Sequence, residues 1–190
     1  MEEVYKEEEH FEKLDFKERP LPKGTYEQCG FTGCDFGESD IAAISFISCE
    51  FNNCNLSMAR IVKTTFQEAR FTGCKMLGLR LEHCNNFLLS FHFENCILDH
   101  ASFYQLKLKG TRFINCRIRD ADFTECDLTA AVFNDTDLAG SVFDQSVLER
   151  ADMRTAFNYM INPEKNRIRK AKFSTSSIAG LLAHYDIIIE

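Results

Sequence analysis

Residues 93–148 read FENCILDHASFYQLKLKGTRFINCRIRDADFTECDLTAAVFNDTDLAGSVFDQSVL, and every fifth residue of this stretch is large and apolar. Phenylalanine alternates with leucine or isoleucine at these centres: Phe93, Leu98, Phe103, Leu108, Phe113, Ile118, Phe123, Leu128, Phe133, Leu138, Phe143 and Leu148. A period of five matches neither the helical period of about 3.6 residues nor the strand period of about 2. The stretch therefore predicts a repeat in which the chain turns once every five residues.

The same period extends over most of the chain. Twelve successive centres run from Tyr26 to Leu81 and thirteen from Phe93 to Met153, with a slip of two residues between the two series. Small residues such as Cys54 stand two positions before most centres. Large and small inward positions on one short extended segment indicate a β-solenoid, in which each coil is stabilised only by its neighbours. The alternation of aromatic and aliphatic centres requires an even number of faces in each coil.

The inward positions are the predicted core. Complete burial is expected above all for nine phenylalanines: Phe31, Phe51, Phe71, Phe93, Phe103, Phe113, Phe123, Phe133 and Phe143. All nine cysteines stand two residues before a centre in their local phase, so we expect reduced, buried thiols that act as small apolar groups.

Metal and catalytic chemistry are not indicated. His83, Cys84, His92 and Cys96 are close in sequence and form a nominal set of four ligands, but the paired C-x2-C spacing typical of zinc sites is missing. The nucleotide-binding and hydrolase motifs are missing as well, and a filled solenoid leaves no pocket for a reaction. We therefore expect no cofactor and no enzymatic activity.

Composition and charge bound the class of protein. The 190 residues are 45% hydrophobic and carry 29 acidic against 22 basic side chains, a net charge of −7. One domain with an ample core is expected, and a basic surface that grips nucleic acid directly is disfavoured. An acidic start, residues 1–9, and the lack of a long apolar run argue against a signal peptide and a membrane span. A cytoplasmic protein that contacts neither membrane nor nucleic acid is expected.

The repeat resembles the pentapeptide-repeat family, through segments such as Cys126-Asp127-Leu128 and residues 54–59 (CNLSMA). The resemblance implies a right-handed quadrilateral β-helix, an all-β fold with four faces per coil. A narrower resemblance to Qnr-type quinolone-resistance proteins rests on residues 54–59, 79–84 and 178–190. It implies homodimers joined at the carboxyl-terminal end, and an acidic rod that occupies the DNA-binding saddle of gyrase or topoisomerase IV.

Three segments follow from the period. Residues 1–25 are expected to cap the rod, residues 26–157 to form the β-helix with a phase break near 83–92, and residues 158–190 to form a loop, a last partial coil and a helix and strand cap. A helix after Ser177 would have one apolar face, and the tail after it is rich in isoleucine. The expected dimer interface is Ile178, Leu181, Leu182, Tyr185, Ile187, Ile188 and Ile189.

Charge gathers in the second half of the repeat. Residues 93–152 carry 11 acidic and 6 basic side chains, a net charge of −5. The expected acidic surface is Asp120, Asp122, Asp127, Asp135, Asp137 and Asp144. Two functions fit: a DNA mimic that binds a type II topoisomerase and protects it from quinolones, or a general scaffold for another protein partner. The short phase break and the modest charge density count against mimicry. Six coils would make a rod of about 30 Å at a strand spacing of about 4.8 Å.

Overall fold

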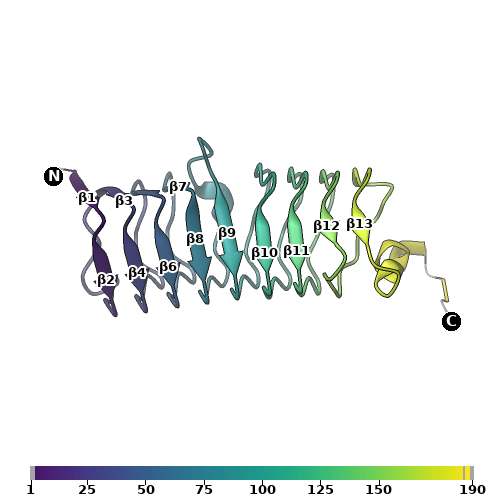
Figure 1. The fold of residues 1–190 in the computed structure, drawn as a ribbon, viewed down its shortest axis with the longest axis horizontal. Coiled ribbons are helices and arrows are strands. Elements are labelled where there is room, and N and C mark those ends of the chain that lie inside the picture. The colour runs from purple at the N-terminus through teal and green to yellow at the C-terminus, as the bar shows by residue number, and fades with distance from the viewer. Residues whose placement is uncertain (1–2, 186, 189–190) are drawn as a thin grey trace.

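The computed structural model describes residues 3–185 and 187–188 and shows a right-handed quadrilateral β-helix drawn out into a rod (Figure 1). The strands are β1 (Val4–Glu7), β2 (His10–Glu12), β3 (Gly24–Glu27), β4 (Gly30–Thr32), β5 (Ser45–Ile47), β6 (Glu50–Asn52), β7 (Thr65–Gln67), β8 (Ala69–Thr72), β9 (Phe91–Glu94), β10 (Arg112–Ile114), β11 (Val132–Asn134), β12 (Asp152–Met153) and β13 (Lys172–Phe173). Three short 3₁₀ helices complete the described elements: η1 (Leu81–His83), η2 (Ile178–Leu181) and η3 (Ala183–Tyr185).

All strand pairs among the described residues are parallel, because each coil repeats the direction of the one before it. Phe31 lies beside Phe51 and Phe113 beside Phe133, so one coil takes 20 residues, five for each of four faces. One face is a nine-stranded sheet that includes every coil, in the order β13-β12-β11-β10-β9-β8-β6-β4-β2. Nine strands give a rod of about 38 Å at a spacing of about 4.8 Å, longer than the sequence estimate.

Left-handed backbone makes the corners of the coil. The residue two positions after a centre has a positive φ, as at Gln28 (53°), Ser48 (51°) and Asn53 (53°). Such a conformation costs a non-glycine residue about 1–2 kcal/mol. The corner N–H groups are satisfied by the next coil, since Gln28 donates to the Ile47 carbonyl at 2.9 Å and Asn53 to the Thr72 carbonyl at 2.8 Å.

The amino-terminal segment, expected as a cap, forms the first coil instead. Strands β1 and β2 pair with β3 and β4 in the ordinary 20-residue register, and Phe11 stacks on Phe31 with ring centroids 4.8 Å apart. Glu9, Leu14 and Arg19 occupy positions where later coils place small residues, and here they are exposed. Regular stacking survives because no earlier coil confines these larger side chains.

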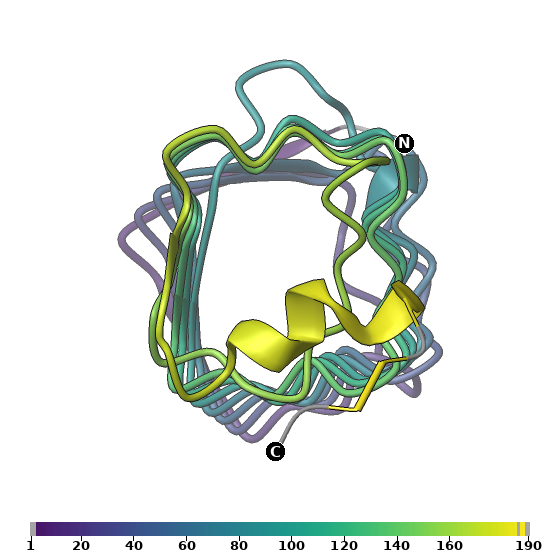
Figure 2. The ribbon, with the colours of Figure 1, turned by 90° about the vertical axis from the view of Figure 1, so that its right-hand side faces the viewer.

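The phase break is a projecting loop between η1 and β9, seen above the coil in Figure 2. Phe71 pairs with Phe93, so this coil takes 22 residues. The loop is anchored at both ends on the coil below, where Asn85 N–H donates to the Thr64 carbonyl (2.9 Å) and Ser90 N–H to the Phe66 carbonyl (3.0 Å). The four-stranded sheet β1-β3-β5-β7 ends at this coil.

The carboxyl-terminal end is closed by η2 and η3, which lie across the last coil (Figure 2). The α-helical spacing expected after Ser177 is not observed. Gly180 packs so tightly against the backbone of Tyr159 that a side chain there would collide with the Tyr159 carbonyl, and its own carbonyl accepts the N–H of Ile161 at 3.0 Å. This contact fixes the short helices to the coil. No helix within the described residues is long and apolar enough to cross a membrane.

Candidate functional site

The interior of the rod is filled by aromatic columns. All nine phenylalanines of the expected core are buried, and Phe143 is the most exposed of them at 5%. Phe113 stacks between Phe93 and Phe133 with ring centroids 5.3 and 4.8 Å apart, and it meets Phe103 and Phe123 edge to face at 5.9 and 6.1 Å. Offset-stacked and edge-to-face contacts are the favoured geometries of aromatic rings. The coil therefore encloses packed side chains rather than a channel.

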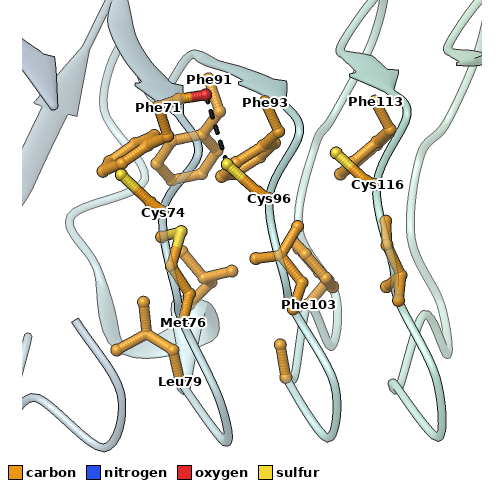
Figure 3. Close-up of a cluster of buried hydrophobic side chains, with 14 of the residues drawn as sticks. Phe71, Cys74, Met76, Leu79, Phe91, Phe93, Cys96, Phe103, Phe113 and Cys116 are labelled. Carbon is orange, nitrogen blue, oxygen red and sulfur yellow. Dashed lines mark hydrogen bonds between the residues drawn. The ribbon is translucent and has the colours of Figure 1, made fainter. Parts of the chain in front are cut away.

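The nine cysteines are free and buried. Several thiols donate to carbonyl oxygens of the preceding coil, as Cys96 Sγ does to Phe71 at 3.3 Å (Figure 3) and Cys74 Sγ to Phe51 at 3.2 Å. Burial raises the pKa of Cys49 and of Cys126 to about 12, so these thiols stay protonated near neutral pH. Protonated buried thiols are poor nucleophiles and poor metal ligands.

The structure does not bring the nominal metal ligands together. Cys84 and Cys96 are buried in the core, whereas His92 points outward from β9. Within residues 3–185 and 187–188, no group of three or more histidine, cysteine or acidic side chains could hold a metal ion.

The expected acidic surface is divided among several environments. Asp120 and Asp135 are exposed, and Asp122, Asp127 and Asp144 are partly buried. Asp137 differs from the expectation, because it is 5% exposed and does not project from the rod. Its carboxylate accepts hydrogen bonds from Arg119 Nε (2.7 Å) and Asn158 Nδ2 (2.8 Å).

Basic partners neutralise much of the remaining acidic charge. Lys109 Nζ lies 3.2 Å from Asp127, and Lys165 Nζ lies 3.9 Å from Asp144. A third pair joins Arg117 to Asp99 across one coil, at 2.7 Å. The surface of the second half is thus a mosaic of ion pairs with separate free carboxylates, not one continuous acidic stripe.

The predicted dimer interface is split by the 3₁₀ geometry. Leu181 is buried against the last coil and Leu182 is partly buried, while Ile178 and Tyr185 are exposed. Ile187 and Ile188 are exposed by 54% and 90% and lie outside any strand, and Ile189 lies outside the described residues. The outer side of the cap therefore keeps four of the expected apolar side chains in solvent.

Sequence reasoning missed an outward column of cations. Arg70, His92 and Arg112 lie side by side on β8, β9 and β10. Their spacings of 22 and 20 residues would have indicated this only if the inserted residues could be placed between Arg70 and His92 within the coil.

Two family descriptions match the chain. "Pentapeptide repeats (8 copies)" matches residues 49–85, and "Pentapeptide repeat region" matches residues 87–156. No curated protein matched the chain.

Solved structures share the fold at low identity. HetL, a pentapeptide repeat protein involved in heterocyst differentiation regulation in the cyanobacterium Nostoc sp. strain PCC 7120, superposes with a TM-score of 0.65 at 16% identity, over 90% of this chain and 86% of HetL. A trypsin-treated variant of QnrB1, a plasmid-mediated fluoroquinolone resistance protein, superposes with a TM-score of 0.56 at 16% identity, over 98% of this chain and 92% of its own. With its five-residue period, four-faced coil and matched repeats, this chain belongs to the pentapeptide-repeat family.

Proposed function

We propose that the chain is a non-enzymatic, protein-binding rod that works as a homodimer. The filled interior carries this proposal: the coil holds stacked rings and buried thiols, so the groups that can meet a partner lie on the outside of a rigid shaft. A solenoid of this kind offers a long surface whose shape does not depend on the partner.

The dimer contact is the carboxyl-terminal end. Ile178, Tyr185, Ile187 and Ile188 project from the cap, and a hollow of about 450 Å³ opens beside it between Val142, Met160 and Ala183. Apolar projections next to an apolar hollow suit a two-fold interface, in which the same surface serves both copies. The proposed occupant of this end is a second copy of the chain.

Sedimentation of the full chain tests the dimer. Ile178→Asp combined with Ile188→Asp should give a monomer with unchanged circular dichroism, because both side chains are exposed. Met58→Asp is the matched control, since Met58 is 64% exposed on the shaft, and it should remain a dimer. A wild-type chain that sediments as a monomer at micromolar concentration would refute the proposal.

A type II topoisomerase is the candidate partner that the charge and dimensions favour. The rod is acidic in its second half, and QnrB1, whose fold it shares, is a fluoroquinolone resistance protein. A dimer would double the length of about 38 Å and could span a DNA-binding saddle. The ion-paired surface supports a docking that relies on a few free carboxylates, such as Asp120 and Asp135, and on the exposed loop residue Phe87.

Gyrase supercoiling assays with and without ciprofloxacin test this partner. The pure protein should restore supercoiling in the presence of the drug, and its binding should weaken steeply with salt, because contacts between exposed charges are screened. Asp120→Asn with Asp135→Asn should reduce protection, whereas Glu38→Gln, on the first half of the shaft, should not. Absent or salt-insensitive gyrase binding would leave another protein as the partner.

A further inference from the structure

A second surface feature lies at the corner where the four-stranded sheet stops. After β7 the chain swings out as the projecting loop, and a hollow of about 590 Å³ remains over β8, β9 and β10. Six polar side chains line it: Ser48, Glu68, Arg70, Ser90, His92 and Arg112. The hollow is thus a consequence of the two extra residues in this coil.

Three cationic side chains form one wall of the hollow. Arg70, His92 and Arg112 are in register on adjacent parallel strands, so neighbours are separated by about one strand spacing, ~4.8 Å. Within the described residues, neither Arg70 nor Arg112 makes an ion pair, whereas Arg60, Arg117 and Arg119 elsewhere on the shaft bond carboxylates.

Electrostatics indicate that the three groups share one space. Burial first, and then the positive charges of Arg112 and Arg70, lower the pKa of His92. The wall therefore holds two guanidinium groups with a neutral imidazole between them near neutral pH. Unpaired guanidinium groups this close together favour an anion that can accept several hydrogen bonds at once.

The other side chains complete the hollow. Ser90 Oγ accepts the backbone N–H of Glu68 at 2.7 Å, which leaves the hydroxyl proton free to donate. Glu68 accepts a hydrogen bond from Ser48 Oγ at 3.1 Å and is the one carboxylate of the lining within the described residues. Glu50 and Glu94 flank the cationic wall on β6 and β9. These carboxylates disfavour a long polyanion and leave room for a compact one.

We propose that this hollow binds a phosphate monoester, with the phosphate held by Arg70, Arg112 and the Ser90 hydroxyl. Guanidinium groups match the oxygens of a phosphate in bidentate geometry, and a hydroxyl adds a third donor. The volume falls within the roughly 300–1,000 Å³ of small-molecule sites, so the organic part of an ester has space beside the phosphate.

Calorimetric titration of the full-length protein with phenyl phosphate tests the site. Wild-type protein should bind one equivalent, and Arg70→Gln combined with Arg112→Gln should weaken binding about ten-fold or more through the loss of two charge-assisted contacts. The matched control is Arg150→Gln with Arg169→Gln, which removes two charges from the opposite end of the second half and should leave the dissociation constant unchanged. Equal weakening by both pairs would reduce the effect to bulk charge and overturn the proposal.

Two further arms sharpen the assignment. Glu68→Gln should tighten phenyl phosphate binding several-fold because it removes the carboxylate from the lining. Inorganic phosphate should bind at the same residues, and weaker binding than that of phenyl phosphate would identify the ester as the ligand class. Wild-type protein that binds neither compound at millimolar concentration would refute the site.

Discussion

The two halves of the rod fill the same coil in different ways. Before the break, the aromatic columns stand on adjacent faces, so that Phe46 meets Phe51 at 5.3 Å. After the break they stand on opposite faces, where Phe103 meets Phe113 at 5.9 Å and 90° across the core. Aliphatic centres occupy the remaining faces in both halves. The coil thus accepts any arrangement that places two rings and two aliphatic groups in each layer.

The break is where one arrangement changes into the other. The column of Phe31, Phe51, Phe71 and Phe93 continues through it, but the column of Tyr26, Phe46 and Phe66 stops. Phe91 takes a position where its partner in β8 is the small Ala69, and its ring lies 5.8 Å from Phe66 and 5.3 Å from Phe93. A large ring at a small position thus fills the space that the outward loop leaves.

The strongest test removes one ring from each half. Phe46→Ala and Phe113→Ala should each lower the free energy of unfolding by about 3–5 kcal/mol, because each deletes a fully buried ring and leaves a cavity. Urea unfolding measures both, and Lys107→Ala, on the exposed shaft, should stay within about 0.5 kcal/mol of wild type. A loss below about 1 kcal/mol in one half alone would show that only the other half relies on ring packing.

The break itself is tested by two phenylalanines four residues apart. Phe91→Ala should lower the free energy of unfolding by about 2–4 kcal/mol, since Phe91 is 6% exposed and joins the two aromatic arrangements. Phe87→Ala should change it by less than about 0.5 kcal/mol, since that side chain is 72% exposed. The same urea titration compares them, and equal effects would contradict the filling role of Phe91.

The sequence predicted the period, the inward centres and the two-residue slip, because a five-residue repeat fixes which side chains face inward. It did not predict what depends on contacts between coils. Leu14 and Arg19 break the pattern of small residues, yet the first coil forms, since nothing lies beneath it. The cap is 3₁₀ rather than α-helical because Gly180 packs on Tyr159.

The candidate surfaces were harder to predict than the core. Asp137 occupies an outward position by its spacing, but Arg119 and Asn158, 18 and 21 residues away in the chain, cover it. Which outward residues are free therefore depends on long side chains from neighbouring coils, and a repeat pattern contains no information about where those side chains lie.

The surface comparison between the halves centres on this carboxylate. In the column of Asp137 the first half places Asn55, whose amide donates to Asp35 Oδ1 at 2.9 Å. Asp137→Asn gives the second half the same chemistry and should lower the free energy of unfolding at pH 7 by about 1–3 kcal/mol, through weaker bonds to Arg119 and Asn158.

The pH dependence of that loss follows from the pKa of Asp137. Burial alone would raise this pKa, but hydrogen bonds from Asn158 and Arg119 lower it below the ordinary 3.8. The stabilisation by the carboxylate is therefore complete above about pH 4 and disappears as the pH falls through the folded-state pKa. Unfolding measured from pH 7 to pH 2.5 should show wild type and Asp137→Asn converging, and exposed Asp135→Asn should lie close to wild type throughout. A gap that persists at the lowest pH would contradict the ionised pair.

The smallest effect is expected in the cysteine column that crosses both halves. Cys74 donates to the Phe51 carbonyl at 3.2 Å, and Thr136, farther along the same column, donates to the Phe113 carbonyl at 3.0 Å. Cys74→Thr should therefore change the free energy of unfolding by less than about 1 kcal/mol, because the hydroxyl can replace the thiol in size and in its hydrogen bond. Cys74→Leu should cost about 1–3 kcal/mol, because the column has room only for small side chains. Thermal unfolding compares the two, and a thiol titration of the native protein should find few reactive groups in either variant. If Cys74→Thr were the more damaging of the two, the column would depend on sulfur rather than on size.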